Sequence, residues 1–252
     1  MKNFILKDRQ FSLLSKLILI GLWAFLSHLI DKEVILPSVR STLVSLINIV
    51  KDPSFFSIIL HSLIRSLFGF LFSLLLAISL GILSSVSKFI YSLLEPILNF
   101  LSSVPTMAII ILALIWLNNE LVPMFVGFIM VFPILYQSVL KAIINIDRKI
   151  MEMASLYKVD RLSIIKDIYI PSIFINLSSV LTSALNINLK MVIAGEVLSQ
   201  PKLGIGSNLQ MEKMYLNTAG VFAWIIIILF ISKVLGYMGS ILKKLSKEEK
   251  WK

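Results

Sequence analysis

Residues that could carry out catalysis are scarce in this chain of 252 residues. It has no cysteine, and its two histidines, His28 and His61, are far apart in the sequence. Disulfides, thiolate metal sites and a cysteine nucleophile are therefore excluded, and a histidine-built metal or acid–base centre is disfavoured. The Gly-x-x-x-x-Gly-Lys-Ser/Thr loop that binds nucleotide phosphates in many ATPases is also missing. Ordinary catalysis has few residues to work with, and we expect this chain to bind no metal or cofactor.

The polar residues that do follow a pattern lie in the apolar run that begins at residue 168. In a helix, at about 100° per residue, six of them share roughly a third of the circumference, opposite an apolar side. They are Asn176, Ser179, Thr182, Ser183, Asn186 and Lys190. Such a stripe avoids lipid, and two interpretations remain open: it lines a solute path, or its small side chains allow close packing of helices. Lys190, near the outer surface, is able either to attract an anionic solute or to snorkel to water.

Arg65 is a charge inside another apolar segment. It lies ~12 Å from the outer end of that segment if the segment is helical. A basic side chain at this depth is costly in a membrane, so it predicts a buried partner. A structural role, with a partner on a second copy of the chain, and a role in solute passage both remain open, and the structural role is favoured. His61, one helical turn earlier, is assigned no function.

The composition says that these residues must be positioned by membrane-spanning helices. Hydrophobic residues make up 58% of the chain, charged residues 15%, and the mean hydropathy is +0.92. In soluble domains, roughly 45–50% of the residues are apolar and about 25% are charged. Windows free of Asp, Glu, Lys and Arg cover 66–87, 96–119, 121–140, 168–189 and 214–232. Each approaches or exceeds the roughly 20 residues that cross a bilayer as a helix.

The apolar run 11–30 resembles a signal peptide, but Asp31, Lys32 and Glu33 follow it in place of a small-residue cleavage site. We therefore expect it to be retained as a first span. The prediction is an all-α integral membrane protein with six spans, at 11–30, 57–83, 89–117, 121–141, 168–195 and 219–242. Residues 1–56 would form an N-terminal part with a tail, the first span and an outer amphipathic helix. Residues 57–252 would form the core.

The basic residues predict the orientation. With the N-terminus inside, the inner segments hold sixteen Lys and Arg residues and the outer segments hold five, namely Lys32, Arg40, Lys51, Lys202 and Lys213. This asymmetry predicts that both termini are cytoplasmic. The net charge of +10 then indicates loops held against an anionic membrane surface, and not nucleic-acid binding.

Two further segments have local signals. Ser102, Ser103, Val104 and Pro105 interrupt the third span, because proline lacks a backbone donor. Such a break is tolerated in a membrane only where protein or a water-lined cavity satisfies the freed carbonyls. After the first span, Leu36, Pro37 and Ser38 precede an apolar pattern of helical spacing. Ser38 is its expected N-cap, and the predicted amphipathic helix would lie on the outer surface.

The inner loop 147–167 is the most charged stretch, yet its apolar residues suit two short amphipathic helices with a turn at Lys158, Val159 and Asp160. These apolar faces could pack back onto the inner ends of the spans. The favoured interpretation is a docking surface for a cytoplasmic partner.

The same loop resembles a signature of the permease subunits of binding-protein-dependent ABC importers, in particular the nitrate, sulfonate and taurine branch. The family pattern is Glu-Ala-Ala, three residues, Gly, nine residues, then Ile-x-Leu-Pro. Here Glu152, Met153 and Ala154 are followed at the same spacing by Lys158 and by Ile168, Tyr169, Ile170 and Pro171. Lys158 replaces the turn glycine, and a lysine in a left-handed conformation costs on the order of 1 kcal/mol. The turn is therefore open to a different construction.

Other stretches carry the resemblance from about residue 36 to 241. They are Leu36-Pro37-Ser38, Ser62-Leu63-Ile64-Arg65 with Gly69, Val104-Pro105 with Ala108 and Trp116, Phe132-Pro133-Ile134, and Glu196 with Leu203-Gly204-Ile205-Gly206. The family's Gly-rich stretch after Trp116 is replaced by Leu117-Asn118-Asn119-Glu120. Each match is weak alone. Their order along the six spans, which were predicted from hydropathy and not from the resemblance, makes the resemblance to the permease family specific.

The resemblance implies a MetI-like permease fold in the bacterial inner membrane. The chain would form a homodimer, surrounded by membrane lipid, with cytoplasmic ATPase subunits that use ATP and an extracytoplasmic substrate-binding protein. Residues expected to couple to the ATPase are Glu152, Met153, Ala154, Lys158, Asp160, Arg161 and Pro171. The path is expected at Ser179, Thr182, Ser183, Asn186 and Lys190, and structural or gating roles fall to Arg65, Pro105, Glu196, Gly204 and Gly206.

Two other classes of membrane protein fit the sequence less well. An ion-coupled secondary carrier would need acidic groups deep in its spans, and Glu95 and Glu120 fall near predicted span ends. A membrane-embedded hydrolase would need a cluster of His, Asp and Ser or of metal ligands. Sulfonates, nitrate, taurine and a small heterocycle all remain open as the substrate.

Overall fold

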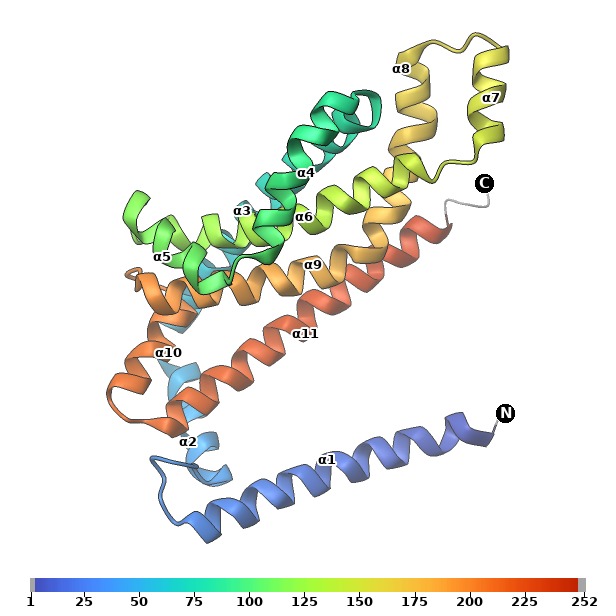
Figure 1. Cartoon of the computed structure of the whole chain (residues 1–252). Helices are drawn as coiled ribbons and strands as arrows, with labels where there is room; N and C mark the ends of the chain where they lie inside the picture. Colours follow the sequence, from blue (N-terminus) through green and yellow to red (C-terminus); the bar gives the residue numbers. More distant parts are fainter. Residues whose placement is uncertain (1–2, 249–252) are drawn as a thin grey trace. The chain divides into compact units, whose positions relative to one another are not determined.

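The computed structural model describes residues 3–248, except for the side chains of residues 3–10, 12, 13, 161 and 240–248. No strand occurs within these residues, so the all-α prediction is confirmed. The helices are α1 (Asn3–Ile30), α2 (Val39–Lys51), α3 (Phe55–Val86), α4 (Lys88–Ser103), α5 (Thr106–Trp116), α6 (Val122–Ile144), α7 (Arg148–Leu156), α8 (Arg161–Ser163), the π-helical turn η1 (Ile164–Tyr169), α9 (Ile170–Ser199), α10 (Ile205–Met214) and α11 (Thr218–Glu248) (Figure 1).

Length and hydropathy mark several helices as membrane spans. Four stretches qualify, namely Phe55–Val86, Val122–Ile144, Ile164–Ser199 and Thr218–Gly239. The pair α4 and α5 forms a fifth candidate if it is counted as one span, and this span is bent by 106° at the break between the two helices. In α1, the described side chains form an apolar stretch at Leu14–Ile30, and the residues just before it lie outside the described side chains, so the first predicted span is not tested at its full length. Five of the six predicted spans thus have a counterpart, and the count of six is not reproduced in full.

The break in the third span is confirmed. Val104 ends α4 in an extended conformation, and Pro105 occupies the N-cap position of α5 with φ −57° and ψ 131°. Its missing N–H falls where no intrahelical partner would exist, so the chain turns there without losing a helical hydrogen bond.

The chain forms two compact units. The first comprises residues 1–57 and 208–229. Within it, the Nε1 of Trp23 donates to the carbonyl of Pro37 at 3.0 Å, and its ring stacks on Phe222 with centroids 5.5 Å apart. Ser38 caps α2 by accepting the N–H of Ser41 at 3.0 Å. The predicted helix and its cap are therefore present.

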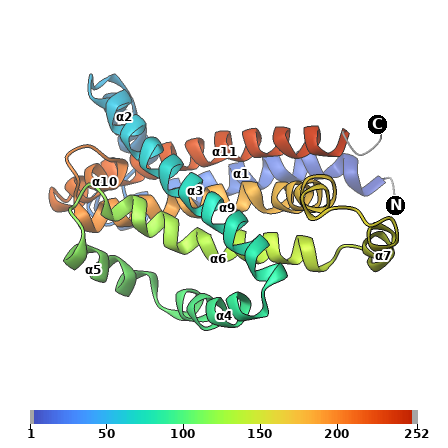
Figure 2. The ribbon, with the colours of Figure 1, turned by 90° about the horizontal axis from the view of Figure 1, so that it is seen from above.

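The second unit comprises residues 58–207 and 230–252, and its centre is the pair α6 and α9. Figures 1 and 2 show these two helices running alongside each other. Their shared core contains Leu135, Val139 and Ala184, all without exposed surface. At Gly195 an added Cβ would lie 2.8 Å from the Cα of Pro123, so only glycine allows the backbones to approach this closely.

A helical hairpin joins α6 to α9 within this unit. It consists of α7, a turn, α8 and η1, and it lies beyond the end of α6 (Figure 1). Pro171 is the second residue of α9 and follows η1 directly, so it removes one backbone donor at the point where the π-helical turn changes to an α-helix. The prediction of two short helices in the loop 147–167 is confirmed, with the second continuing directly into α9.

Candidate functional site

The hairpin between α6 and α9 is built from two capped helices. The side chain of Asp147 accepts the N–H of Lys149 at 2.9 Å and begins α7. Asp160 accepts the N–H groups of Leu162 and Ser163 at 3.1 Å each and begins α8. Hydrogen bonds from Ser163 and Leu162 lower the pKa of Asp160 below its ordinary value, because they favour the carboxylate.

Lys158 adopts the conformation of the glycine that it replaces. Its φ is 51°, in the left-handed region. The N–H of Lys158 donates to the carbonyl of Ser155 at 3.1 Å, and that of Val159 donates to Ala154 at 2.9 Å, which closes the end of α7. The construction of this turn, which the sequence leaves open, is therefore a left-handed one with lysine at the glycine position. Two capped helices separated by so few residues impose the left-handed turn on the lysine.

The apolar side chains of the hairpin are mostly exposed. Leu156, Tyr157 and Leu162 are 80%, 79% and 78% exposed, and Met153 is 58% exposed. Only Ala154 is buried, at 7%. A shallow cavity of about 350 Å³ lies between the two arms, lined by Ile150, Met153, Ala154, Tyr157, Val159, Ser163, Asp167 and Ile168. Packing within the chain thus buries Ala154 and partly covers Met151, Ile164, Ile165 and Ile168, and it leaves Leu156, Tyr157 and Leu162 exposed.

The predicted coupling charges lie on the same exposed hairpin. Glu152 and Arg148 form an ion pair at 3.3 Å one helical turn apart, with side chains 63% and 92% exposed. A pair this exposed stabilises α7 by less than about 1 kcal/mol, so both charges are available to a partner. The side chain of Arg161 lies outside the described residues.

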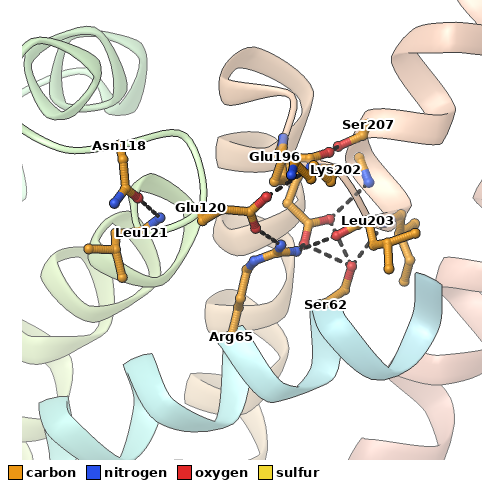
Figure 3. Close-up of polar contacts among 12 residues, drawn as sticks. Ser62, Arg65, Asn118, Glu120, Leu121, Glu196, Lys202, Leu203 and Ser207 are labelled. Carbon is orange, nitrogen blue, oxygen red and sulfur yellow. Dashed lines mark hydrogen bonds and ion pairs between the residues drawn. The ribbon is translucent and has the colours of Figure 1, made fainter. Parts of the chain in front are cut away.

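A buried ionic cluster lies at the opposite end of α9 (Figure 3). Glu196 has no exposed surface, and its carboxylate accepts hydrogen bonds from Ser62 Oγ at 2.8 Å, Arg65 Nη1 at 2.9 Å and the N–H of Gly206 at 2.9 Å. Arg65 Nη1 also donates to the carbonyl of Leu203 at 2.6 Å. The predicted buried partner of Arg65 is therefore Glu196 of the same chain.

The two glycines after α9 leave room for this carboxylate. A Cβ on Gly204 would lie 2.8 Å from the carboxyl carbon of Glu196, and one on Gly206 would lie 2.4 Å from the carbonyl oxygen of Ile193. Neither glycine has a positive φ, so both are required for space and not for backbone conformation. The structural role predicted for Gly204 and Gly206 therefore corresponds to close contacts with Glu196 and with the backbone of α9.

Glu120 completes the cluster from the loop between α5 and α6. It forms an ion pair with Arg65 Nη2 and accepts the N–H of Lys202 at 3.0 Å. Partial burial raises the pKa of Glu120, but these hydrogen bonds and the charges of Arg65 and Lys202 outweigh burial and hold it below its ordinary value. Its side chain is half exposed, so Glu120 is the accessible arm of an otherwise buried cluster.

The polar stripe of α9 is divided by its surroundings. Ser179, Ser183 and Lys190 are exposed, whereas Thr182 faces α11. A Cβ on Gly239 would lie 2.3 Å from Thr182 Oγ1, and one on Gly236 would lie 3.7 Å from the Nδ2 of Asn186. Close packing against α11 therefore explains Thr182 and Asn186, and it does not explain the exposed members of the stripe.

Sequence reasoning missed several polar contacts. Glu196 was placed just outside the fifth span, but α9 continues to Ser199 and buries it. Ser62, one turn before Arg65, and Glu120, the sole acidic residue between 96 and 140, carried a signal that could have identified them. Asn188, fully buried, donates to the carbonyl of Ser66 at 2.6 Å and fixes α9 against α3. In the part of the chain that the structure describes, no three acidic or histidine side chains gather to hold a metal ion.

Comparison with known proteins identifies the family that this chain matches. The family described as "Binding-protein-dependent transport system inner membrane component" matches residues 69–246. The "Putative aliphatic sulfonates transport permease protein SsuC" of Bacillus subtilis is 24% identical over 225 residues, which cover 88% of this chain and 81% of that protein. A "Probable ABC transporter permease protein" of Brucella melitensis is 26% identical over 222 residues, covering 86% and 87%.

The family match extends over most of the chain, from Gly69 in α3 through Glu120, the hairpin and Glu196 into α11. The described helices include several that can cross a membrane. The chain therefore belongs to the inner-membrane components of binding-protein-dependent transport systems, as the multi-pass permease subunit of an ABC importer.

Proposed function

We propose that this permease acts as a homodimer that moves a small solute across the inner membrane by alternating access. Separate cytoplasmic ATPase subunits hydrolyse ATP, and an extracytoplasmic binding protein delivers the solute. The hairpin α7–η1 docks on the ATPase and transmits its closure to α6 and α9, because it is continuous with both. The chain itself carries out no hydrolysis.

The exposed apolar surface of the hairpin is the observation that carries this proposal. Leu156, Tyr157 and Leu162 are each more than three-quarters exposed on a segment that also holds Glu152, Lys158 and Arg148. Contiguous apolar side chains rimmed by charges are typical of a protein interaction surface. Packing in a cleft would supply affinity, and the charges would set register.

The charge asymmetry supports the orientation. Sixteen basic residues lie in the segments assigned to the cytoplasm, and the hairpin is one of these segments. We place both termini and residues 147–167 inside. Lys202 and the cluster around Glu196 are then at the outer face, where the binding protein arrives.

The substrate is a small solute of the kind that relatives carry. SsuC of Bacillus subtilis is named for aliphatic sulfonates. Exposed Ser179 and Ser183 on α9 offer hydroxyls to such a solute, and Lys190, at the outer part of the same helix, offers a positive charge. We assign these three residues to the path and assign Thr182 and Asn186 to packing against α11.

Copurification with the ATPase from detergent tests the docking. Glu152→Lys and Ala154→Asp should each lower recovery of the ATPase strongly, because a reversed or buried charge at a docked interface costs about 2–5 kcal/mol. Glu33→Lys, an exposed charge reversal outside the hairpin, is the matched control and should leave recovery unchanged.

Undiminished ATPase recovery with both hairpin variants would contradict the docking role. Uptake that continues without the ATPase subunit would instead favour an ion-coupled carrier. The buried carboxylate of Glu196 gives that alternative little support, because Arg65 already neutralises it.

A further inference from the structure

A cavity of mixed lining, partly apolar and partly polar, lies between α4 and α6, away from the residues assigned above. Its volume is about 310 Å³. Leu98 and Leu140 contribute apolar surface, and the remaining lining is polar: Tyr91, Glu95 and Asn99 from α4, and Tyr136, Gln137 and Lys141 from α6. The three residues of α4 are spaced by four, so they share one face of that helix.

One of these groups is buried with an unmet hydrogen bond. Tyr136 is 2% exposed, and its hydroxyl has no hydrogen bond of ordinary geometry among the described residues. The hydroxyl of Ser84 lies beside it, and the two share at most one weak hydrogen bond, because neither has a partner of ordinary geometry. A buried hydroxyl that lines a cavity without a partner is unfavourable unless a ligand or water occupies the cavity.

The charged and amide groups of the cavity are also free. Within residues 3–248, neither Glu95 nor Lys141 makes an ion pair, and Asn99 and Gln137 make no side-chain hydrogen bond. Glu95 is exposed, seven residues after the start of α4 and so ~10 Å along the helix. Even near the end of a span a carboxylate without an ion pair is unfavourable in hydrocarbon, so this surface is expected to meet water, solute or protein.

We propose that this α4–α6 pocket binds the transported solute in the cytoplasmic half of the path, and that it fits a small zwitterion. Glu95 binds the ammonium group of the solute, aided by the ring face of Tyr91. Lys141 and Gln137 bind the sulfonate or carboxylate oxygens, and Tyr136 supplies a further hydrogen bond. This assignment rests on the proposed function, and it narrows the solute from a plain anion to one that carries both charges.

The dimensions agree with a small solute. Small-molecule sites range from about 300 to about 1,000 Å³, and this pocket is at the lower end. Its opposite charges come from different helices, Glu95 on α4 and Lys141 on α6. A relative motion of these helices would therefore change both contacts together, as release into the cytoplasm requires.

Thiol accessibility in membranes that hold the assembled transporter tests the pocket, because the chain has no native cysteine. Gln137→Cys should react with a water-soluble methanethiosulfonate at least about tenfold faster than Ile97→Cys, since thiolates form in water and seldom in lipid. Ile97 is exposed on α4 at a similar depth but does not line the pocket. Asn99→Cys reports from the opposite wall if Gln137→Cys does not insert.

Protection by solute tests the charge preference. The probes are 2-aminoethanesulfonate, ethanesulfonate and ethylammonium. The zwitterion should protect Gln137→Cys at about tenfold lower concentration than either singly charged probe, as two charge contacts exceed one. When Glu95→Gln is added to Gln137→Cys, the zwitterion should protect no better than ethanesulfonate. When Lys141→Gln is added instead, the zwitterion should protect no better than ethylammonium.

Equal protection by all three probes would overturn the proposal, as would thiols at Gln137 and Asn99 that are no more reactive than that at Ile97. The labelling needs neither ATP nor an intact hairpin. A failure here is therefore distinguishable from a failure of the docking experiment.

Discussion

The buried ion pair between Arg65 and Glu196 predicts a large loss of stability when the cation alone is removed. In Arg65→Met, Glu196 remains without exposed surface, and only the hydrogen bonds from Ser62 and Gly206 still compensate its charge. Removing one partner of a buried pair costs about 3–5 kcal/mol. At about 2–4 °C per kcal/mol for a chain of this size, the apparent unfolding midpoint should fall by roughly 6–20 °C.

Glu120→Gln is the matched control, because it removes the other carboxylate that contacts Arg65. Its side chain is half exposed, so the loss should stay within about 1 kcal/mol, or about 2–4 °C. The double variant Arg65→Met with Glu196→Met should recover most of the loss, because an apolar pair leaves no buried charge.

Heating in detergent followed by size-exclusion chromatography of the remaining folded protein measures these midpoints. The reasoning is refuted if Arg65→Met loses no more than Glu120→Gln, since the exposed and the buried arms of the cluster would then be equivalent.

Three further outcomes follow from the geometry. Gly239→Ala should cost about 1–3 kcal/mol in thermal stability, because its Cβ would lie 2.3 Å from Thr182 Oγ1, and Thr182→Ala should restore part of the loss; additive losses would contradict the contact. The folded-state pKa of Glu120 is lowered from 4.5, so its contribution is present above that pH and is lost as the pH falls through the lower folded value. The stability difference between the unchanged chain and Glu120→Gln should therefore shrink as the pH falls below about 4.5, and a difference that stays constant there would exclude the contact. In intact cells an impermeant thiol reagent should label Ser207→Cys but not Ser155→Cys, and the reverse pattern would overturn the orientation.

Local patterns were sufficient for much of the architecture. Apolar runs predicted helices, because a membrane requires each backbone polar group to be satisfied within its own segment. Pro105 predicted the break between α4 and α5, and Ser38 predicted the start of α2, since both act through adjacent backbone groups. The apolar spacing within residues 147–167 predicted the two short helices of the hairpin, because helical periodicity is a local property of the sequence.

Contacts between distant segments could not be predicted in this way. The hydrophobicity of its surroundings indicated that Arg65 needs a partner, but Glu196 lies 131 residues away and Glu120 lies 55 away. Helical periodicity likewise showed that one face of α9 avoids lipid, without showing whether Thr182 meets a glycine of α11 or water. Periodicity describes one helix at a time.

The left-handed Lys158 and the α4–α6 pocket illustrate the same limit. Intrinsic preference disfavours a lysine at φ 51°, but closure of two capped helices outweighs about 1 kcal/mol of local strain. Glu95 and Lys141 lie in segments whose sequences give no sign that they line one cavity. The chain's own residues were enough to predict five of the segments that are long and apolar enough to cross a membrane, because that depends on solvation segment by segment. Which side chains meet depends on how the helices pack, and only the folded structure decided it.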